Sequence, residues 1–281
     1  MLYGVAYYHE YQPYERLAED IRLMKEAGLT VVRLGESTWS SWEPDDGRFE
    51  FAWMDRVIDA LHEAGIKVIL GIPSYAIPAW LHRKFSELMA EYERGNRAYY
   101  GARQNMNHAH PGYRFHVERV VRQLASHYAQ HPAIIGYQVD NETGSGLLYN
   151  PDVFQKFVDY LKDKFKSVER LNEVWGLTYW SHRLRDWADL WTPDGNTTPG
   201  YDLEWRRFQA SLVTDLLAWE KNIVKEYARP DQFVTQCVVG MHGRAESDVY
   251  DIAAEMDVLP PRETVHPRQR DRVVSRRAWQ A

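Results

Sequence analysis

The sequence predicts an α/β fold: a (β/α)8 TIM barrel that is incomplete, with about strands one to six present. Two observations predict this class. Short β-branched runs alternate with amphipathic stretches, as in βα units on a parallel sheet. The segments KEAGLTVVRLG at 25–35 and HEAGIKVILG at 62–71 also share one layout at a spacing of 37 residues. That period suits a barrel of equivalent units, although a doubly wound open sheet would show it too.

The predicted elements follow in order along the chain. Strands at 3–8, 30–35 and 67–72 alternate with helices at about 14–27 and 52–64. Gly28 and Gly65 close these two helices, where a left-handed backbone is least costly for glycine. A helix at about 113–129 leads to a fourth strand at 133–139. Helices at about 151–165 and 203–228 lead to a fifth strand at 233–239, and a sixth begins at 257–259.

The pattern stops at Pro260. The last 22 residues contain six arginines and show neither helical nor alternating apolar periodicity. They open with two prolines, which remove donors where a buried strand would continue. A solvated basic tail or a nucleic-acid arm fits this composition, but we favour a change of coding frame near residue 259. We therefore divide the chain into a partial TIM-barrel domain, 1–259, and an atypical basic tail, 260–281, that is not native barrel sequence.

Composition narrows the function classes. The net charge of −6 argues against nucleic acid as the main partner. No apolar run approaches the length of a membrane span, and the N-terminus lacks a secretory leader. The single cysteine, Cys237, cannot form an internal disulfide, which favours a cytoplasmic protein. The content of 11 Trp and 18 Tyr is high. Aromatic planes stack on sugar rings, but packing in the core explains many such positions equally well.

Polar residues crowd the end of the fourth strand, in QVDNE. Gln138, Asp140, Asn141 and Glu142 lie at its exit, and the carboxyl ends of barrel strands face the active site. The alternative is a loop in which Asp140 or Asn141 caps the next element.

A second polar group ends the second strand, in VVRLGES. Arg33 lies inside this apolar run, followed by Glu36 and Ser37. An unpaired buried arginine is costly, so we expect Arg33 to point into the barrel mouth beside a carboxylate. Structural pairing and substrate binding both remain open for it.

These motifs resemble those of a known family. Asn-Glu at the end of strand four resembles the acid/base motif of the large (β/α)8 glycosidase clan. Five runs resemble family 42 β-galactosidases and come in the order expected for that family. They are VVRLGESTWSSWEP, GIPSYAIPAWL (71–81), ARQNMNHAHPGYR, GYQVDNE and LNEVWGLTYWS. The resemblance covers residues 1 to about 259. It implies a retaining glycoside hydrolase that cleaves terminal β-D-galactosides and needs no cofactor.

The resemblance also implies residue roles. Glu142 matches the acid/base, and Asn141 matches the neighbour that binds the sugar 2-hydroxyl. Arg33 and Arg103 match arginines of the galactose subsite, and Trp180 matches an aromatic at the sugar platform. A retaining enzyme needs such an acid together with a second, nucleophilic carboxylate.

The chain departs from the family in three respects. The nucleophilic glutamate is expected after strand seven, and we find no strand seven in the sequence. Glu263 is the only glutamate of the tail, and its surroundings do not resemble those of the nucleophile. The tyrosine expected after strand six is also missing. We therefore expect weak or no activity from this chain alone. The zinc-binding cysteines of some members are also absent. His108 and His110 could replace them, but we expect a lone loop pair to be solvated and predict no metal site.

Alternatives remain open. A non-catalytic carbohydrate-binding barrel could use the same aromatic cleft. A lyase or aldolase would need a Schiff-base lysine, and Lys67 begins strand three at the wrong end for that. The residues also permit a β-glucoside or an α-L-arabinoside in place of a β-galactoside. Family members often form homotrimers, which makes a homo-oligomer an expectation here.

Overall fold

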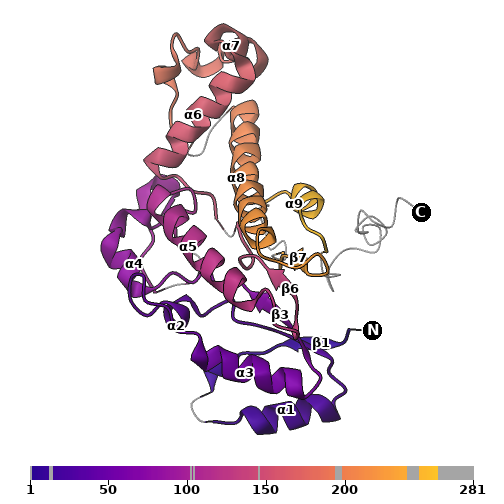
Figure 1. Cartoon of the computed structure of the whole chain (residues 1–281). Coiled ribbons are helices and arrows are strands. Elements are labelled where there is room, and N and C mark those ends of the chain that lie inside the picture. Colours follow the sequence, from indigo (N-terminus) through magenta and orange to yellow (C-terminus); the bar gives the residue numbers. More distant parts are fainter. Residues whose placement is uncertain are drawn as a thin grey trace, which may run out of the picture.

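Five strands form one parallel sheet in the computed structural model, which describes residues 2–12, 15–101, 103, 105–144, 146–193, 198–238 and 247–258. The order is β1-β2-β3-β6-β7, and β4 and β5 form a separate antiparallel hairpin (Figure 1). The strand bounds are β1 Gly4–Ala6, β2 Val31–Leu34, β3 Lys67–Gly71, β4 Glu91–Tyr92, β5 Asn96–Arg97, β6 Ile134–Gln138 and β7 Phe233–Thr235.

The strand order separates a barrel arc from an open doubly wound sheet. Each strand of the large sheet pairs with the strand of that sheet that comes next along the chain, and the order does not reverse among the described strands. A doubly wound sheet reverses at a switch point. Winding in one direction with right-handed crossovers instead places the connecting helices on one face and leaves the other as a barrel interior. The described sheet is therefore a barrel arc.

The helices follow one another around this arc (Figure 1). Helices α1, α3, α5, α8 and α9 connect consecutive strands, and the others lie in the connections or in the lobe formed by α6 and α7. The helix bounds are α1 Leu17–Glu26, α2 Trp39–Trp42, α3 Ala52–Glu63, α4 Ala79–Lys84, α5 Pro111–Tyr128, α6 Pro151–Phe165, α7 Val168–Trp175, α8 Pro199–Lys225 and α9 Val249–Glu255. Short 3₁₀ turns are η1 His9–Tyr11, η2 Ser86–Leu88, η3 Glu93–Gly95, η4 Tyr179–Ser181 and η5 Trp187–Asp189.

The predicted elements are present with shifted ends. Gly28 and Gly65 have φ of +72° and +77°, which confirms their left-handed positions after α1 and α3. The start of a sixth strand is confirmed by a parallel bridge between Thr235 and Val258. Helix α1 begins three residues later than predicted and α8 four residues earlier. The proposed tail, 260–281, lies outside the described residues.

Two hydrophobic clusters hold the fold together. The larger one fills the layer between the sheet and its outer helices, where β-strand residues such as Val32, Leu34 and Val68 are fully buried. The second joins α6, α7 and the first half of α8 around Phe157, Tyr201 and other aromatic side chains. This second cluster makes a lobe that the sequence periodicity alone does not separate from the barrel.

Strand β1 differs from the other strands of the sheet in its exposure. All three of its residues are exposed, Val5 by 46%, and the preceding Tyr3 is 60% exposed. Among the described strands, β1 pairs with β2 on one side and with none on the other. Among the described residues, the barrel interior therefore opens at β1, beside α1.

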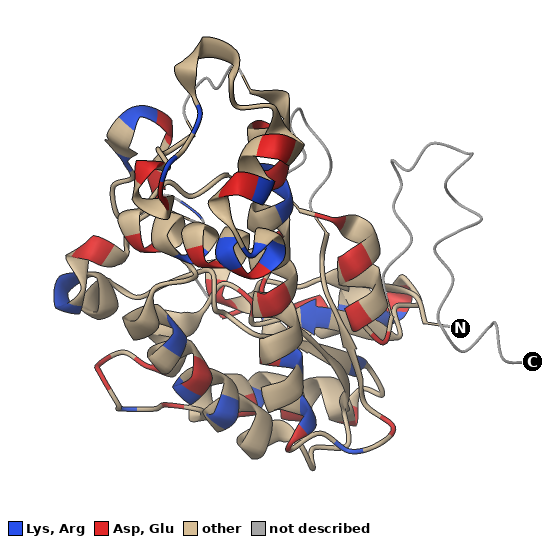
Figure 2. Ribbon diagram, turned by 90° about the horizontal axis from the view of Figure 1, so that it is seen from above, with Lys and Arg blue, Asp and Glu red and all other residues tan. Residues whose placement is uncertain are grey.

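Charged residues of both signs are interspersed along the helices (Figure 2). The expectation that nucleic acid is not the main partner stays a prediction. Within the described ranges, no helix is both long enough and apolar enough to cross a membrane.

Candidate active site

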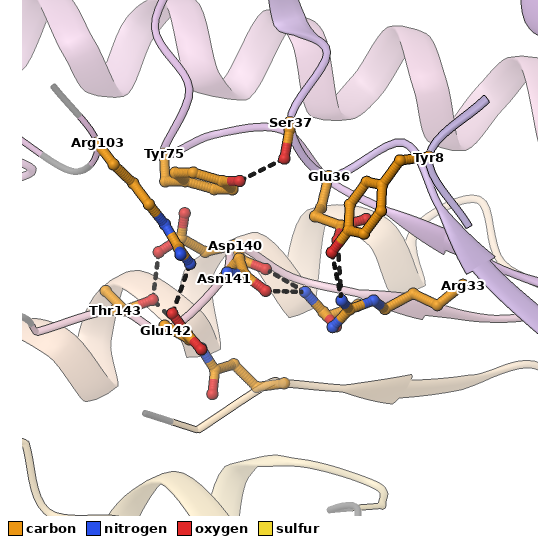
Figure 3. A network of polar contacts seen from close by, with 12 residues as sticks. Tyr8, Arg33, Glu36, Ser37, Tyr75, Arg103, Asp140, Asn141, Glu142 and Thr143 are labelled. Atoms are coloured by element: carbon orange, nitrogen blue, oxygen red, sulfur yellow. Dashed lines mark hydrogen bonds and ion pairs between the residues drawn. The ribbon is translucent and has the colours of Figure 1, made fainter. Parts of the chain in front are cut away.

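Arg33 lies at the centre of a polar network at the carboxyl ends of the strands (Figure 3). Its Nη2 lies 2.9 Å from Glu36 Oε1, and Nη1 donates to Gln138 Oε1 at 2.7 Å. Nη2 also donates to the Tyr8 hydroxyl at 3.2 Å. These contacts join the ends of β1, β2 and β6. They confirm the prediction that Arg33 points into the barrel mouth beside a carboxylate.

Burial and charge act on Arg33 in opposite directions. Burial works against its positive charge, but the Glu36 carboxylate, together with Cys237 and Tyr8, outweighs this, so the pKa of Arg33 is raised. Burial and then the Glu36 carboxylate raise the pKa of the Tyr8 hydroxyl. Arg33 therefore stays cationic and Tyr8 stays a neutral hydrogen-bonding group at neutral pH.

Gly71, at the end of β3, leaves the space that Glu36 occupies. A Cβ on Gly71 would lie 2.6 Å from the Cβ of Glu36 and 2.7 Å from its backbone nitrogen. Such distances leave no room for a side chain. Gly71 therefore lets the residue after β2 cross the end of β3, with its carboxylate turned toward Arg33.

The chain makes a tight turn as it leaves β6. Asp140 and Glu142 both adopt positive φ, 43° and 52°, a conformation that costs a non-glycine residue about 1 kcal/mol or more. The backbone amide of Glu142 donates to the Cys237 carbonyl at 2.9 Å, and Val139 donates to Thr235 at 3.0 Å. The turn is thus fixed to the segment after β7 on one side.

Side chains fix the other side of this turn. The Asp140 carboxylate accepts hydrogen bonds from Ser74 Oγ at 3.0 Å and from the Thr143 hydroxyl. Asp140 is 1% exposed, and burial raises its pKa to about 6 despite these donors. The alternative that Asp140 or Asn141 caps the next element is wrong, because the next helix, α6, has Asn150 at its N-cap. Asp140 instead stabilises its own turn through the Thr143 contact. Its bond to Ser74 adds a link to the loop after β3.

Asn141 links the turn to the arginine. Gln138 Nε2 donates to Asn141 Oδ1 at 3.0 Å and to the Asp140 carbonyl at 2.9 Å, while Gln138 Oε1 accepts from Arg33. The Gln138 amide therefore joins Arg33 and Asn141 into one network. Asn141 is 5% exposed and lies at the wall of the cleft described below.

Glu142 points toward an arginine across the site (Figure 3). Arg103 Nη2 lies 2.5 Å from Glu142 Oε2, and the two side chains are 52% and 34% exposed. The guanidinium also lies over the Tyr75 ring, 5.2 Å from its centroid. The Tyr75 hydroxyl shares a hydrogen bond with Ser37. The Glu142 side chain is therefore partly exposed to solvent and is held beside Arg103.

A cavity of about 870 Å³ begins at these residues and continues beside β1. At the site it is lined by Tyr8, Ser37, Tyr75, Arg103 and Asn141. The lining farther along β1 and α1 is mainly apolar and aromatic and includes Tyr7, Tyr11, Leu23, Met24 and Leu29. Gln12, Arg16 and Asp20 also line this part, which follows the open β1 edge, so the end at Tyr8, Arg103 and Asn141 is the part that belongs to the site.

Trp180 lies elsewhere in the described structure. It is in the 3₁₀ turn after α7, is 65% exposed and has a φ of 55°. Its ring contacts Tyr179, and it does not line the cavity at Arg103 and Asn141. The structure therefore does not bring Trp180 together with the other four predicted site residues, and its role at a sugar platform remains a prediction.

The two loop histidines have structural roles, so the expectation that they are solvated is wrong. His108 is 8% exposed, and burial lowers its pKa to about 3. His110 Nδ1 accepts from the Gly112 amide at 3.1 Å and caps the first turn of α5. Among the described residues, no group of three or more His, Cys, Asp or Glu side chains could hold a metal.

Comparison with known proteins agrees with this geometry. The profile of a family described as beta-galactosidase, glycoside hydrolase family 42, matches residues 6–276. The chain belongs to glycoside hydrolase family 42. The match runs past residue 259 into the segment that the sequence analysis separates as a tail, so that boundary remains a prediction.

Characterised relatives carry the same family description. The chain is 35% identical over 260 residues to a beta-galactosidase of Thermus thermophilus. The aligned segment covers 90% of this chain and 40% of that protein. It is 37% identical over 229 residues to the beta-galactosidase BglY of Alicyclobacillus acidocaldarius, covering 80% and 33%. The chain thus spans between a third and two fifths of the length of these relatives.

Solved structures show the same fold. The cold-adapted beta-galactosidase of Rahnella sp. R3 has a TM-score of 0.87 at 34% identity, covering 92% of this chain and 38% of that one. The beta-galactosidase of Bacillus circulans sp. alkalophilus has a TM-score of 0.87 at 28% identity, covering 94% and 41%. A beta-amylase catalytic domain from Paenibacillus polymyxa, at 14% identity and a TM-score of 0.63, shares the fold alone. These likenesses confirm the TIM-barrel prediction.

Sequence reasoning missed several residues of the site. Tyr8 and Tyr75 line the cleft, and Ser74 holds Asp140. Tyr8 and Ser74 could have been found, because Tyr8 ends the predicted strand 3–8 and Ser74 lies two residues after the predicted strand 67–72. Glu220 of α8 was also missed, although it interrupts the apolar stripe of Leu216, Leu217, Ile223 and Val224 at helical spacing. A carboxylate on an apolar helix face is a signal in itself.

Proposed function

We propose that this chain supplies the acid/base half of a retaining β-galactosidase active site. The observation that carries the proposal is Glu142, held on a strained turn at the barrel mouth and directed at Arg103 beside an aromatic-lined cavity. The relatives from Thermus thermophilus and Alicyclobacillus acidocaldarius are both described as beta-galactosidases. A β-galactoside is therefore the substrate that we propose.

Glu142 would donate a proton to the leaving glycosidic oxygen and later remove one from water. Asn141 would bind the sugar 2-hydroxyl, because its side chain lies at the cleft wall next to Glu142. Arg33, Arg103 and Tyr8 would hold other hydroxyls. Their donors lie in fixed positions because each is already part of the network, which limits the entropy lost when a sugar binds.

The second carboxylate of the mechanism is the part that the described strands do not supply. A retaining glycosidase places its nucleophile roughly 5–5.5 Å from the acid/base, and the family positions it after a seventh strand. The described sheet has five strands and one bridge of a sixth. We propose that this chain by itself turns over β-galactosides slowly or not at all.

The experiment is an assay of the purified chain on a chromogenic β-galactoside, with the Glu142→Ala variant beside it. We expect no turnover above that of the variant. Robust turnover that Glu142→Ala abolishes would contradict the missing nucleophile while supporting the role of Glu142. Robust turnover that survives the substitution would contradict the proposed role of Glu142 itself.

Three finer expectations belong to the same proposal: a cytoplasmic location, a homotrimer and a preference for galactose over glucose. The preference is the most accessible of the three. Matched titrations with a galactose-configured and a glucose-configured inhibitor would measure it. Equal affinity for the two would remove galactose selectivity from the proposal.

A further inference from the structure

Two carboxyl groups lie buried behind the catalytic turn. Asp140, at the exit of β6, is 1% exposed, and Glu220, on α8, is 0% exposed. After burial, Asp140 is the largest cause that raises the pKa of Glu220. Two buried like charges at close range are unfavourable, and such a pair ionises in two separate steps.

The hydrogen bonds assign the charge within this pair. The Asp140 carboxylate accepts from the hydroxyls of Ser74 and Thr143. Neither Oε1 nor Oε2 of Glu220 has a hydrogen-bond partner of good geometry, although Ser74 and the backbone of Asp140 lie near it. A carboxylate without donors in the interior is strongly disfavoured. The negative charge therefore belongs on Asp140.

The groups around the pair compensate a second negative charge only in part, since burial and Asp140 raise the pKa of Glu220 more than the attraction of Arg114 lowers it. On α5, Tyr113 is buried and donates to the Ser74 carbonyl at 3.2 Å. Arg114 donates to the His108 carbonyl at 2.8 Å and lies over the Trp219 ring. Burial lowers the pKa of Arg114, against the attraction of Tyr113, Glu220 and Asp215.

The remaining charged group that faces the pair lies across the turn. Arg103 acts on Asp140, but it is half exposed and pairs with Glu142. Its charge is shared with Glu142 and screened by solvent. The surroundings thus support one buried negative charge in this region and not two.

We infer that Glu220 is a protonated carboxylic acid at neutral pH and that it positions the catalytic turn by leaving the single buried charge on Asp140. The Asp140 carboxylate then keeps its bonds to Ser74 and Thr143, which hold the turn in which Asp140 and Glu142 have positive φ. Glu220 is a positioning residue: it acts on Glu142 only through Asp140. The inference that Glu220 is protonated rests on the buried geometry. The inference that this matters for catalysis rests on the proposed function.

The test compares Glu220→Gln with the wild-type full chain. Glutamine reproduces the shape and neutrality of a protonated glutamic acid. A neutral Glu220 whose unfolded form ionises near pH 4.5 contributes stability that is lost as the pH rises above that value. The variant escapes this loss, so its Tm minus that of the wild type should increase as the pH rises from 4.5 to 8. The control, Glu63→Gln, changes an exposed carboxyl on α3 and should give a flat difference.

Infrared spectroscopy tests the same state without requiring a stable variant. Wild-type protein at neutral pH should show the carbonyl absorption of a protonated carboxylic acid, and Glu220→Gln should lack it. A wild-type spectrum without this absorption would overturn the inference. So would a Glu220→Gln variant whose Tm at neutral pH falls below that of the wild type, because an ionised Glu220 with donors would lose them on substitution. These results leave the assignment of Glu142 untouched, which the galactoside assay tests separately.

Discussion

Removing the Arg33 side chain should destabilise the protein through the charge that it leaves behind. Glu36 is 1% exposed, and Arg33 is its ion-pair partner at 2.9 Å. In Arg33→Met, the Glu36 carboxylate stays buried without a cation. Breaking a buried pair costs roughly 3–5 kcal/mol. The Arg33 side chain is itself 21% exposed, so water enters more easily here, and we expect about 3 kcal/mol.

A double-mutant cycle isolates the charge effect. Glu36→Gln removes the negative charge but keeps an acceptor for Arg33 and should cost about 1–2 kcal/mol, close to the value of one charge-assisted hydrogen bond. The double variant Arg33→Met/Glu36→Gln buries no ion in this pair. It should cost no more than Arg33→Met alone, which gives a coupling energy of about 2 kcal/mol.

Urea unfolding followed by circular dichroism measures all three free energies of unfolding. A loss of about 3 kcal/mol in Arg33→Met should also lower the Tm by roughly 6–12 °C for a chain of this size. If the two single costs add in the double variant, the pair is not coupled, and the interpretation of Arg33 as the partner of a buried carboxylate is refuted.

Three further predictions follow from the described geometry. Gly71→Ala should cost about 2–3 kcal/mol in urea unfolding, since its Cβ would meet Glu36 at 2.6 Å; an unchanged midpoint would contradict that close approach. The pKa of Asp140 rises from 3.8 to about 6 in the folded protein, so its contribution to stability, about 3 kcal/mol, is present below pH 3.8 and lost as the pH rises to 6. Asp140→Asn should lose less stability than the wild type between pH 3.8 and 6. The same pH dependence of stability in both proteins would count against the raised pKa of Asp140. Val5→Lys, on the open edge strand, should lower aggregation measured by light scattering; unchanged scattering would show that this edge is covered.

The periodic parts of the fold are predictable from the sequence. The alternation of β-branched runs and amphipathic helices identified the strands of the sheet, and Gly28 and Gly65 marked helix ends because their left-handed backbone is locally determined. Arg33 was predictable because an arginine in a buried strand needs a partner. The order of the strands was not, since periodicity is the same in a barrel and an open sheet.

Other parts of the site depend on contacts between distant residues. The bond from Ser74 to Asp140 joins residues 66 positions apart, and no local pattern indicates it. The lobe of α6 and α7 is amphipathic like any barrel helix, so its separate core appears only in the packing. The structural role of His108 was missed for a similar reason, because burial depends on the elements that cover the loop.

The most direct test of the account joins residues 1–258 to the remaining part of the Thermus thermophilus relative, which would complete the barrel. The measurement is turnover of a chromogenic β-galactoside by this hybrid and by its Glu142→Gln form, with Glu63→Gln as control. We predict activity in the hybrid and in the control, and a loss of roughly 10²–10⁴-fold in Glu142→Gln, the range of general acid/base catalysis. A folded hybrid that turns over the substrate equally well with Gln at position 142 would contradict the assignment of Glu142 as the acid/base.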